Sequence, residues 1–180
     1  MKQHGPWTIR ETKTVYRDPW INVTCDNVLR PDGKPGTFSV VHLKPGVTVL
    51  ALDDNHMVYL TKEFHYAVGR VTIECVSGGI ETDENAASSA ARELEEEIGI
   101  VAKKWTYLSV CDPFTSSVVS PTQMYLAEDL QMVAACPEGT ELIERVSFPL
   151  TEAIHMVTRC EITHAASCLA ILLTARRLGL

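Results

Sequence analysis

The stretch Gly78–Ile100, with the sequence GGIETDENAASSAARELEEEIGI, decides which fold the chain adopts. Asp83 or Asn85 is placed to cap the start of a helix, and Gly99 is placed to end it. Between them, small and apolar residues recur at i, i+3, i+4, i+7 and i+11, the spacing of one helix face: Ala87, Ala90, Ala91, Leu94 and Ile98. We therefore predict a helix over residues 85–98 that packs closely on a sheet through this face.

A second face of this helix is acidic. Glu93, Glu96 and Glu97 fall within about 100° of arc, and Arg92 stands four residues before Glu96, where it can hydrogen-bond that carboxylate. Exposed like charges at this spacing cost about 0.2–0.5 kcal/mol per pair, and a hard divalent ion such as Mg²⁺ or Mn²⁺ offsets that cost. The helix is therefore either a metal-binding face or a solvated acidic surface.

The turn before the helix favours the metal-binding interpretation. Ser77-Gly78-Gly79 leaves a predicted strand and leads through Glu84 into the helix. Glycines allow a tight turn, so backbone carbonyls can face the same ion as the helix carboxylates. Strand, glycine turn and acidic helix face together predict a pocket for a metal-bound diphosphate.

This stretch resembles the signature of the Nudix hydrolase family. The signature is Gly, five residues, Glu, seven residues, then Arg-Glu-apolar-x-Glu-Glu-x-Gly-apolar, and Gly78, Glu84 and Arg92–Ile100 fill every fixed position. The resemblance implies an α/β fold, the Nudix α/β/α sandwich with a mixed β-sheet, preceded here by an N-terminal β-hairpin region. It also implies metal-dependent hydrolysis of a nucleoside diphosphate linked to another group.

The resemblance assigns roles to the residues of this stretch. Glu93 and Glu97, with Glu96 nearby and the carbonyl of Ser77, would hold Mg²⁺ or Mn²⁺. Arg92 would orient Glu96. Glu84 would brace the loop or contact a metal indirectly.

Shorter matches resemble the ADP-ribose and ADP-sugar pyrophosphatase branch. They include Asp18-Pro19-Trp20 in the first hairpins and Glu63-Phe64-His65-Tyr66 followed by Glu74 before the signature. Two positions depart from the branch. His65 stands where an arginine usually grips the substrate. Ser120 stands where a catalytic or metal-binding glutamate is usual, so Glu96, or Glu144 from another loop, is the candidate general base.

Candidate substrate contacts outside the signature are fewer and less specific. Trp20 can stack on adenine, a contact worth about 1–3 kcal/mol, or can anchor its hairpin. His65 and Arg70 can touch phosphate or be structural. Glu74 belongs to the matched strand, and Phe114 can shape a substrate loop.

The rest of the chain is consistent with a small cytoplasmic enzyme. It has 180 residues, 46% of them hydrophobic, and a net charge of −7, which argues against a general nucleic-acid-binding surface. No apolar stretch is long enough to span a bilayer, so no membrane partner is expected. Residues 1–42 are predicted to form a β-hairpin segment and 43–180 the catalytic domain. Further strands are expected at 37–43, 46–52, 57–64, 70–75, 105–110 and 123–127, and further helices at 151–157 and 163–178.

The expected partner is a small nucleoside diphosphate substrate, most plausibly ADP-ribose or another nucleotide sugar. The apolar N-terminal hairpins also suggest a homodimer. The alternative function is a module that binds a nucleotide sugar without hydrolysing it and regulates a partner. An intact signature argues against that alternative, and the missing loop acid argues for it.

Overall fold

The computed structural model describes residues 1–136, 139 and 142–180, which form two compact units. The N-terminal unit comprises residues 1–45 and 112–120, and the C-terminal unit comprises residues 46–111 and 121–180. Each unit is described separately below.

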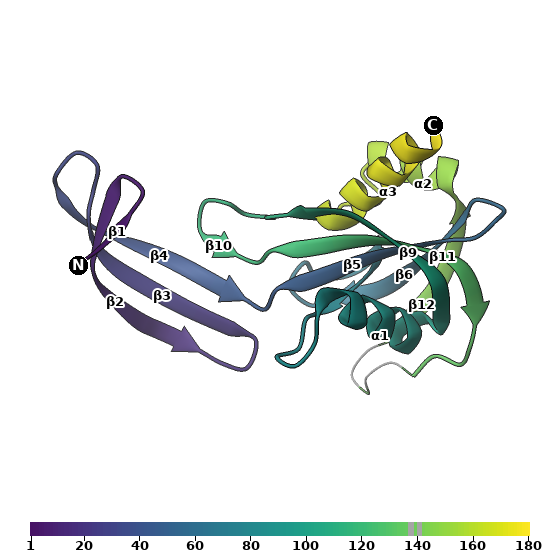
Figure 1. The fold of residues 1–180 in the computed structure, drawn as a ribbon, viewed down its shortest axis with the longest axis horizontal. Helices are drawn as coiled ribbons and strands as arrows, with labels where there is room; N and C mark the ends of the chain where they lie inside the picture. The colour runs from purple at the N-terminus through teal and green to yellow at the C-terminus, as the bar shows by residue number, and fades with distance from the viewer. Residues whose placement is uncertain (137–138, 140–141) are drawn as a thin grey trace. The chain divides into compact units, whose positions relative to one another are not determined.

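The N-terminal unit is a five-stranded sheet in the order β1-β2-β3-β4-β10 (Figure 1). Asp18 accepts the backbone N–H groups of Trp20 and Ile21 and thereby closes the β2–β3 turn that the sequence predicts. The fifth strand comes from a distant part of the chain and runs parallel to β4, which sequence analysis did not anticipate. The bounds are β1 Lys2–His4, β2 Trp7–Arg17, β3 Ile21–Leu29, β4 Pro35–Leu43 and β10 Val118–Val119.

The C-terminal unit has a mixed sheet between helices. The strand order is β12-β6-β5-β11-β9, with β7 added to β6 and β8 added to β5; β5 and β11 are parallel, and the other pairs are antiparallel. The strands are β5 Gly46–Leu52, β6 Met57–His65, β7 Arg70–Glu74, β8 Val76–Gly79, β9 Ile100–Cys111, β11 Thr122–Met132 and β12 Glu144–Pro149, and the helices are α1 Ala86–Ile98, α2 Leu150–Thr158 and α3 Ala165–Leu178.

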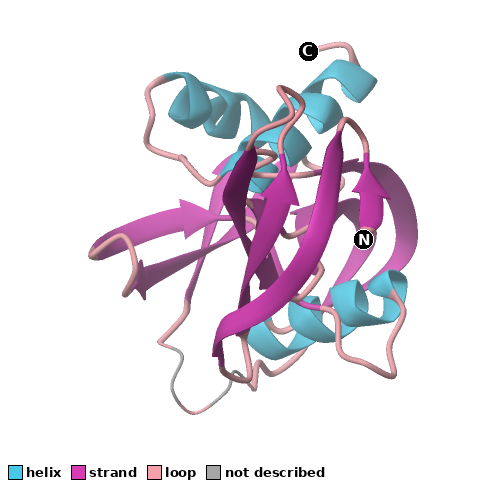
Figure 2. Ribbon diagram, turned by 90° about the vertical axis from the view of Figure 1, so that its left-hand side faces the viewer, coloured by secondary structure: helices cyan, strands magenta, loops and turns pink. Residues whose placement is uncertain are grey.

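Helices cover both faces of this sheet. Figures 1 and 2 show α1 on one face and α2 with α3 on the other. Each face has its own core: Leu94 and Ile98 of α1 pack on β5 and β9, and Ile171 of α3 packs with Leu50 and Leu60 from the sheet. The predicted α/β/α sandwich is therefore confirmed. Among the helices in the described residues, none has the length and apolar character needed to cross a bilayer.

Helix α1 begins and ends where the sequence predicts. The side chain of Asn85 accepts the N–H of Ser88 at its start, and Gly99 ends it with a left-handed φ of 63°. The predicted face is wrong in two positions, because Ala87 and Ala91 are exposed. The face that packs on the sheet instead contains Ala90, Leu94 and Ile98, which are four residues apart, and Ser89 beside them is also buried.

The predicted strands are present, but two further strands of the C-terminal unit were missed. β8 is only four residues long and ends in two glycines, and β12 begins with charged residues and ends in Pro149, so neither has the usual composition of a strand. Both form because a neighbouring strand supplies hydrogen bonds: β5 pairs with β8, and β6 pairs with β12. Both predicted C-terminal helices are confirmed by α2 and α3.

Candidate active site

The predicted turn at Ser77-Gly78-Gly79 is wrong: these residues belong to strand β8, because β5 pairs with them, and the strand leads into the loop before α1. Ser77 lies opposite Thr48 of β5, and their hydroxyl oxygens are 3.0 Å apart. The Ser77 hydroxyl also donates to the carbonyl of Cys75, at 3.1 Å. These bonds engage the Ser77 side chain, and the ligand that the resemblance implies is its backbone carbonyl.

Gly78 and Glu93 are in direct contact. A Cβ atom on residue 78 would overlap the carboxyl group of Glu93, so this part of β8 admits only glycine if Glu93 keeps its position. The Glu93 side chain is only 14% exposed. A carboxylate thus lies against the backbone of strand β8.

Arg92 organises the acidic residues around this contact. Its guanidinium donates two hydrogen bonds to Glu84, at 2.9 and 3.1 Å, and one to Glu96, at 2.9 Å. The same group lies 2.9 Å from a carboxyl oxygen of Glu93 and 3.3 Å from the carbonyl of Gly79. The predicted bond from Arg92 to Glu96 is therefore present, and one cation holds three carboxylates in fixed orientations.

Glu84 closes the loop onto the helix. Beside the Arg92 bonds it accepts the hydroxyl of Ser89, at 2.6 Å. The hydrogen bonds from Arg92 and then Ser89 lower the pKa of the Glu84 carboxyl to about 2. Arg92 in turn has a raised pKa, mainly because of Glu84. Glu84 is thus ionised at neutral pH and fastens the loop to α1.

The donor set at this place fits a magnesium-like ion. Glu93 and Glu97 are half-buried and four residues apart on α1, which brings their Cβ atoms within about 5–6 Å of each other. Among the described residues, no three His, Cys, Asp or Glu side chains form a ready metal cage. Mg²⁺ does not need one, because it usually keeps several waters and takes one or two carboxylates plus substrate phosphates. Two carboxylates and a backbone carbonyl meet that requirement.

His65, Arg70 and Glu74 come together at the end of the β6–β7 hairpin. His65 lies opposite Arg70, and its Nε2 is 3.5 Å from Glu74 and 4.0 Å from Glu63. The guanidinium of Arg70 donates to the Thr163 hydroxyl just before α3, at 2.8 Å. The sequence placed these three residues in one region, but it did not indicate that Glu74 is the partner of His65.

Glu144 lies in a different setting from the one expected. It is the first residue of β12 and not part of a loop, because β12 pairs along the full length of its strand with β6. Its carboxyl forms an ion pair of 2.8 Å with Lys62 of β6, whereas the carboxyl of Glu96 binds Arg92. Glu96 thus belongs to the cluster around Arg92, whereas Glu144 pairs with a lysine of the neighbouring strand.

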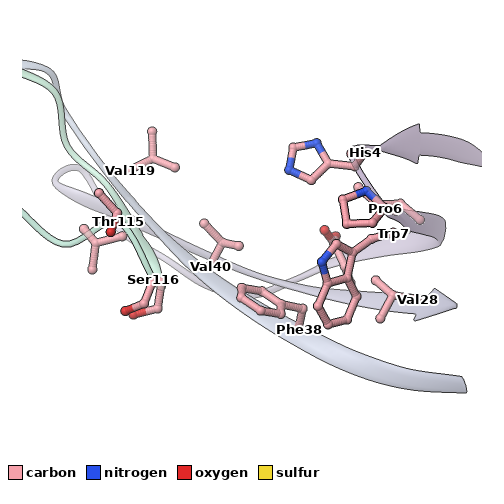
Figure 3. Close-up of a pocket in the computed structure, with 14 residues that line it drawn as sticks. His4, Pro6, Trp7, Val28, Phe38, Val40, Thr115, Ser116 and Val119 are labelled. Carbon is pink, nitrogen blue, oxygen red and sulfur yellow. The ribbon is translucent and has the colours of Figure 1, made fainter. Parts of the chain in front are cut away.

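Trp20 and Phe114 belong to the N-terminal unit. Both are mostly exposed, at 70% and 65%, so each has a free aromatic surface. The same unit contains a cavity of about 380 Å³, where Trp7 and Phe38 meet edge to face with ring centroids 5.6 Å apart (Figure 3). Thr115, Ser116 and Val119 line its other side. Sequence analysis did not anticipate this cavity.

Ser89, His164 and Ser167 were missed as members of the site region. Ser89 binds Glu84, and His164 and Ser167 lie around Glu74. A serine three residues before Arg92 has no distinctive pattern, and His164 is about ninety residues from its partner in the chain. Only tertiary contacts reveal these side chains.

Comparison with known proteins agrees with this geometry. The NUDIX domain family matches residues 42–165, which is more than half of the chain and includes β8 and α1. The chain belongs to this family. Residues 7–41 match a second family, the nucleoside diphosphate sugar hydrolase N-terminal domain.

Individual relatives of this NUDIX protein point the same way. It is 29% identical over 159 residues to an ADP-ribose pyrophosphatase of Bacillus subtilis, covering 87% of this chain and 86% of the relative. It is 27% identical over 175 residues to an ADP-ribose pyrophosphatase of Mycobacterium tuberculosis, covering 96% and 84%. A crystal structure of an ADP compounds hydrolase superposes with a TM-score of 0.84 at 21% identity, covering 99% and 97% of the two chains, which supports the fold.

Proposed function

We propose that this NUDIX protein is a metal-dependent pyrophosphohydrolase that cleaves the diphosphate of ADP-ribose or a closely related nucleotide sugar. The observation that carries the proposal is the cluster in which Arg92 holds Glu84, Glu93 and Glu96 beside Gly78. The two pyrophosphatase relatives support the choice of ADP-ribose.

The reaction is attack of water on one phosphorus of the diphosphate. The new P–O bond forms as the bridging P–O bond breaks, and ADP-ribose gives AMP and ribose 5-phosphate. A bound Mg²⁺ or Mn²⁺ would neutralise phosphate charge and lower the pKa of a water molecule. Glu93, Glu97 and the Ser77 carbonyl would hold the ion. We assign proton removal from the attacking water to Glu96, which Arg92 orients.

Candidate substrate contacts are proposed for each unit by itself. In the N-terminal unit, Trp20 offers an exposed aromatic face that can stack on adenine, and Phe114 can shape a substrate loop. In the C-terminal unit, His65, Arg70 and Glu74 form a polar group that can contact substrate.

We also propose a cytoplasmic homodimer formed through the N-terminal unit, residues 1–42 in the division drawn from the sequence. This unit exposes large apolar side chains that a monomer leaves in water, and a partner chain would cover them. They include Val15, Tyr16, Phe38 and Leu43. Light scattering coupled to size exclusion tests this part, and a monomeric mass contradicts it.

The deciding experiment is an assay of ADP-ribose with Mg²⁺ or Mn²⁺ that measures AMP and ribose 5-phosphate. Other ADP-sugars, GDP-mannose, dinucleotide cofactors and nucleoside triphosphates complete the substrate panel. Absence of turnover on the whole panel, together with measurable binding, would favour the second candidate, a non-hydrolytic binding module. Ser120, which stands in place of the usual loop acid, is the observation that keeps this candidate open.

A further inference from the structure

A buried carboxylate links two histidines at the N-terminal end of α3. One carboxyl oxygen of Glu74 accepts the Thr72 hydroxyl, at 2.7 Å, and lies 3.5 Å from Nε2 of His65. The other oxygen lies 3.2 Å from Nδ1 of His164. The Glu74 side chain is 15% exposed, whereas His65 is 41% exposed. Glu74 is therefore the least exposed member of the group, and His65, at 41%, is more exposed than His164, at 32%.

His164 acts in this group as a neutral donor. Its Nδ1 faces the Glu74 carboxylate and, at 2.8 Å, the hydroxyl of Ser167, which itself accepts the N–H of buried Cys75. A carboxylate only accepts hydrogen bonds, so Nδ1 carries the hydrogen. Burial lowers the pKa of His164, Glu74 opposes this effect and His65 adds to it. His164 thus binds Glu74 without cancelling its negative charge.

The other ionisable groups around His65 can be named. Glu63 lies on its own strand at 4.0 Å, and Arg70 lies opposite it on β7 and is bound to Thr163. The thiols of Cys75 and Cys168, which are close to Glu74, have pKa values raised by burial and stay neutral. A protonated His65 therefore has the Glu74 carboxylate as its partner.

The group is close to the signature along the chain. Glu74 precedes Ser77 by three residues, which span at most about 10 Å of extended backbone. That is within the length of a nucleoside diphosphate sugar whose diphosphate lies at Ser77–Gly79. The exposed edge of His65 is thus placed to meet an anionic part of such a ligand.

We propose that His164 is a positioning residue, which holds Glu74 so that Glu74 orients His65 for contact with the anionic substrate. This inference rests on the proposed function. Loss of His164 therefore weakens substrate binding, while the chemical step, which occurs at the carboxylate cluster, does not depend on His65.

Steady-state kinetics with ADP-ribose at pH 6 test the proposal. His164→Ala should raise KM at pH 6 by about three- to tenfold and leave kcat within about twofold, as expected for a loss of binding alone. His164→Asn, which keeps an N–H donor near the position of Nδ1, should restore the wild-type KM.

Two further variants sharpen the test. His65→Ala should raise KM at least as much as His164→Ala does. His155→Asn is the matched control, because His155 is an exposed histidine on α2, and it should behave as wild type. A His164→Ala protein with the wild-type KM overturns the proposal.

Histidine NMR separates this inference from the proposed function. In ¹⁵N-labelled wild-type protein at pH 7 we expect His164 to be neutral with its hydrogen on Nδ1, and we expect His164→Ala but not His155→Asn to change the His65 signals. A charged His164, or unchanged His65 signals, overturns the positioning role whether or not ADP-ribose is hydrolysed. If the NMR result holds and no substrate of the panel is cleaved, the proposed function fails and the positioning of His65 by His164 stands.

Discussion

The carboxyl group of Glu93 occupies the space that a Cβ atom on Gly78 would fill. A glycine is therefore needed at this point of β8 because a helix carboxylate rests on the strand backbone. The contact joins two residues of the signature that are fifteen positions apart in the chain.

Gly78→Ala should separate folding from catalysis. The new methyl group meets the far end of a flexible side chain, so Glu93 swings away and the strand persists. We expect a near-normal melting temperature and a loss of turnover of about 100-fold, the scale for removal of one electrostatic group. Gly139→Ala, where a Cβ meets nothing within 4 Å, is the control. Wild-type turnover in Gly78→Ala would show that the position of Glu93 is unimportant.

Glu97→Gln should preserve the fold and lower turnover by about 100-fold or more, because the amide is a poor ligand for a hard cation. Glu95→Gln is a matched control, since Glu95 is an exposed residue of the same helix. The measurement is kcat with saturating Mg²⁺ or Mn²⁺. Equal losses in both variants would point to a general effect of helix charge instead of a specific ligand.

Metal binding should be visible without any substrate. A ligand that binds only the folded state stabilises it by RT ln(1 + [L]/Kd), about 2.7 kcal/mol at a concentration 100 times Kd. We expect millimolar Mn²⁺ to raise the melting temperature, EDTA to reverse the rise, and Glu97→Gln to reduce it. No shift in the wild-type protein would support the solvated acidic surface.

Arg92→Lys should destabilise the protein, because an ammonium group cannot reproduce the paired hydrogen bonds to Glu84 while also reaching Glu93 and Glu96. The expected decrease in the free energy of unfolding is about 1–3 kcal/mol, the range for hydrogen bonds to charged groups. Urea denaturation measures it. Arg177→Lys, at an exposed position near the end of α3, should leave stability unchanged. An unchanged urea midpoint for Arg92→Lys would contradict the bracing role.

The ion pair between Glu84 and Arg92 predicts how the stability of the protein changes with pH. The pKa of Glu84 is about 2 in the folded protein, compared with an ordinary value of 4.5. The contribution of its ion pair to folding stability is therefore complete above about pH 5 and is lost as the pH falls toward 2. We expect Glu84→Gln to be less stable than wild type at pH 6, and we expect the difference to shrink by pH 3. Thermal melts at both pH values provide the comparison. A difference that grows on acidification would have the wrong sign.

The local sequence pattern was sufficient to predict much of this structure. The period of α1, its caps at Asn85 and Gly99, and the β5–β6 hairpin at Asp53 all depend on interactions between residues close in the chain, and such interactions leave a readable spacing. The bond from Arg92 to Glu96 was predictable for the same reason, since i and i+4 are neighbours on any α-helix.

The prediction failed where distant segments decide the structure. Ala87 and Ala91 are exposed because the angle at which α1 lies on the sheet selects which of two adjacent alanine rows is buried. The strands β8 and β12 exist because β5 and β6 pair with them, and the helix caps say nothing about such pairings.

The sequence by itself determined the NUDIX helix, its acidic face and the alternating strands, because the spacing of residues close in the chain reveals the helix period and the strand period. Tertiary structure alone decided that Glu93 rests on Gly78, that Glu144 pairs with Lys62, and that Glu74 is shared by His65 and His164. Each of these contacts joins residues from different elements. No spacing along the chain encodes them, since they exist only once the sheet and its helices have packed.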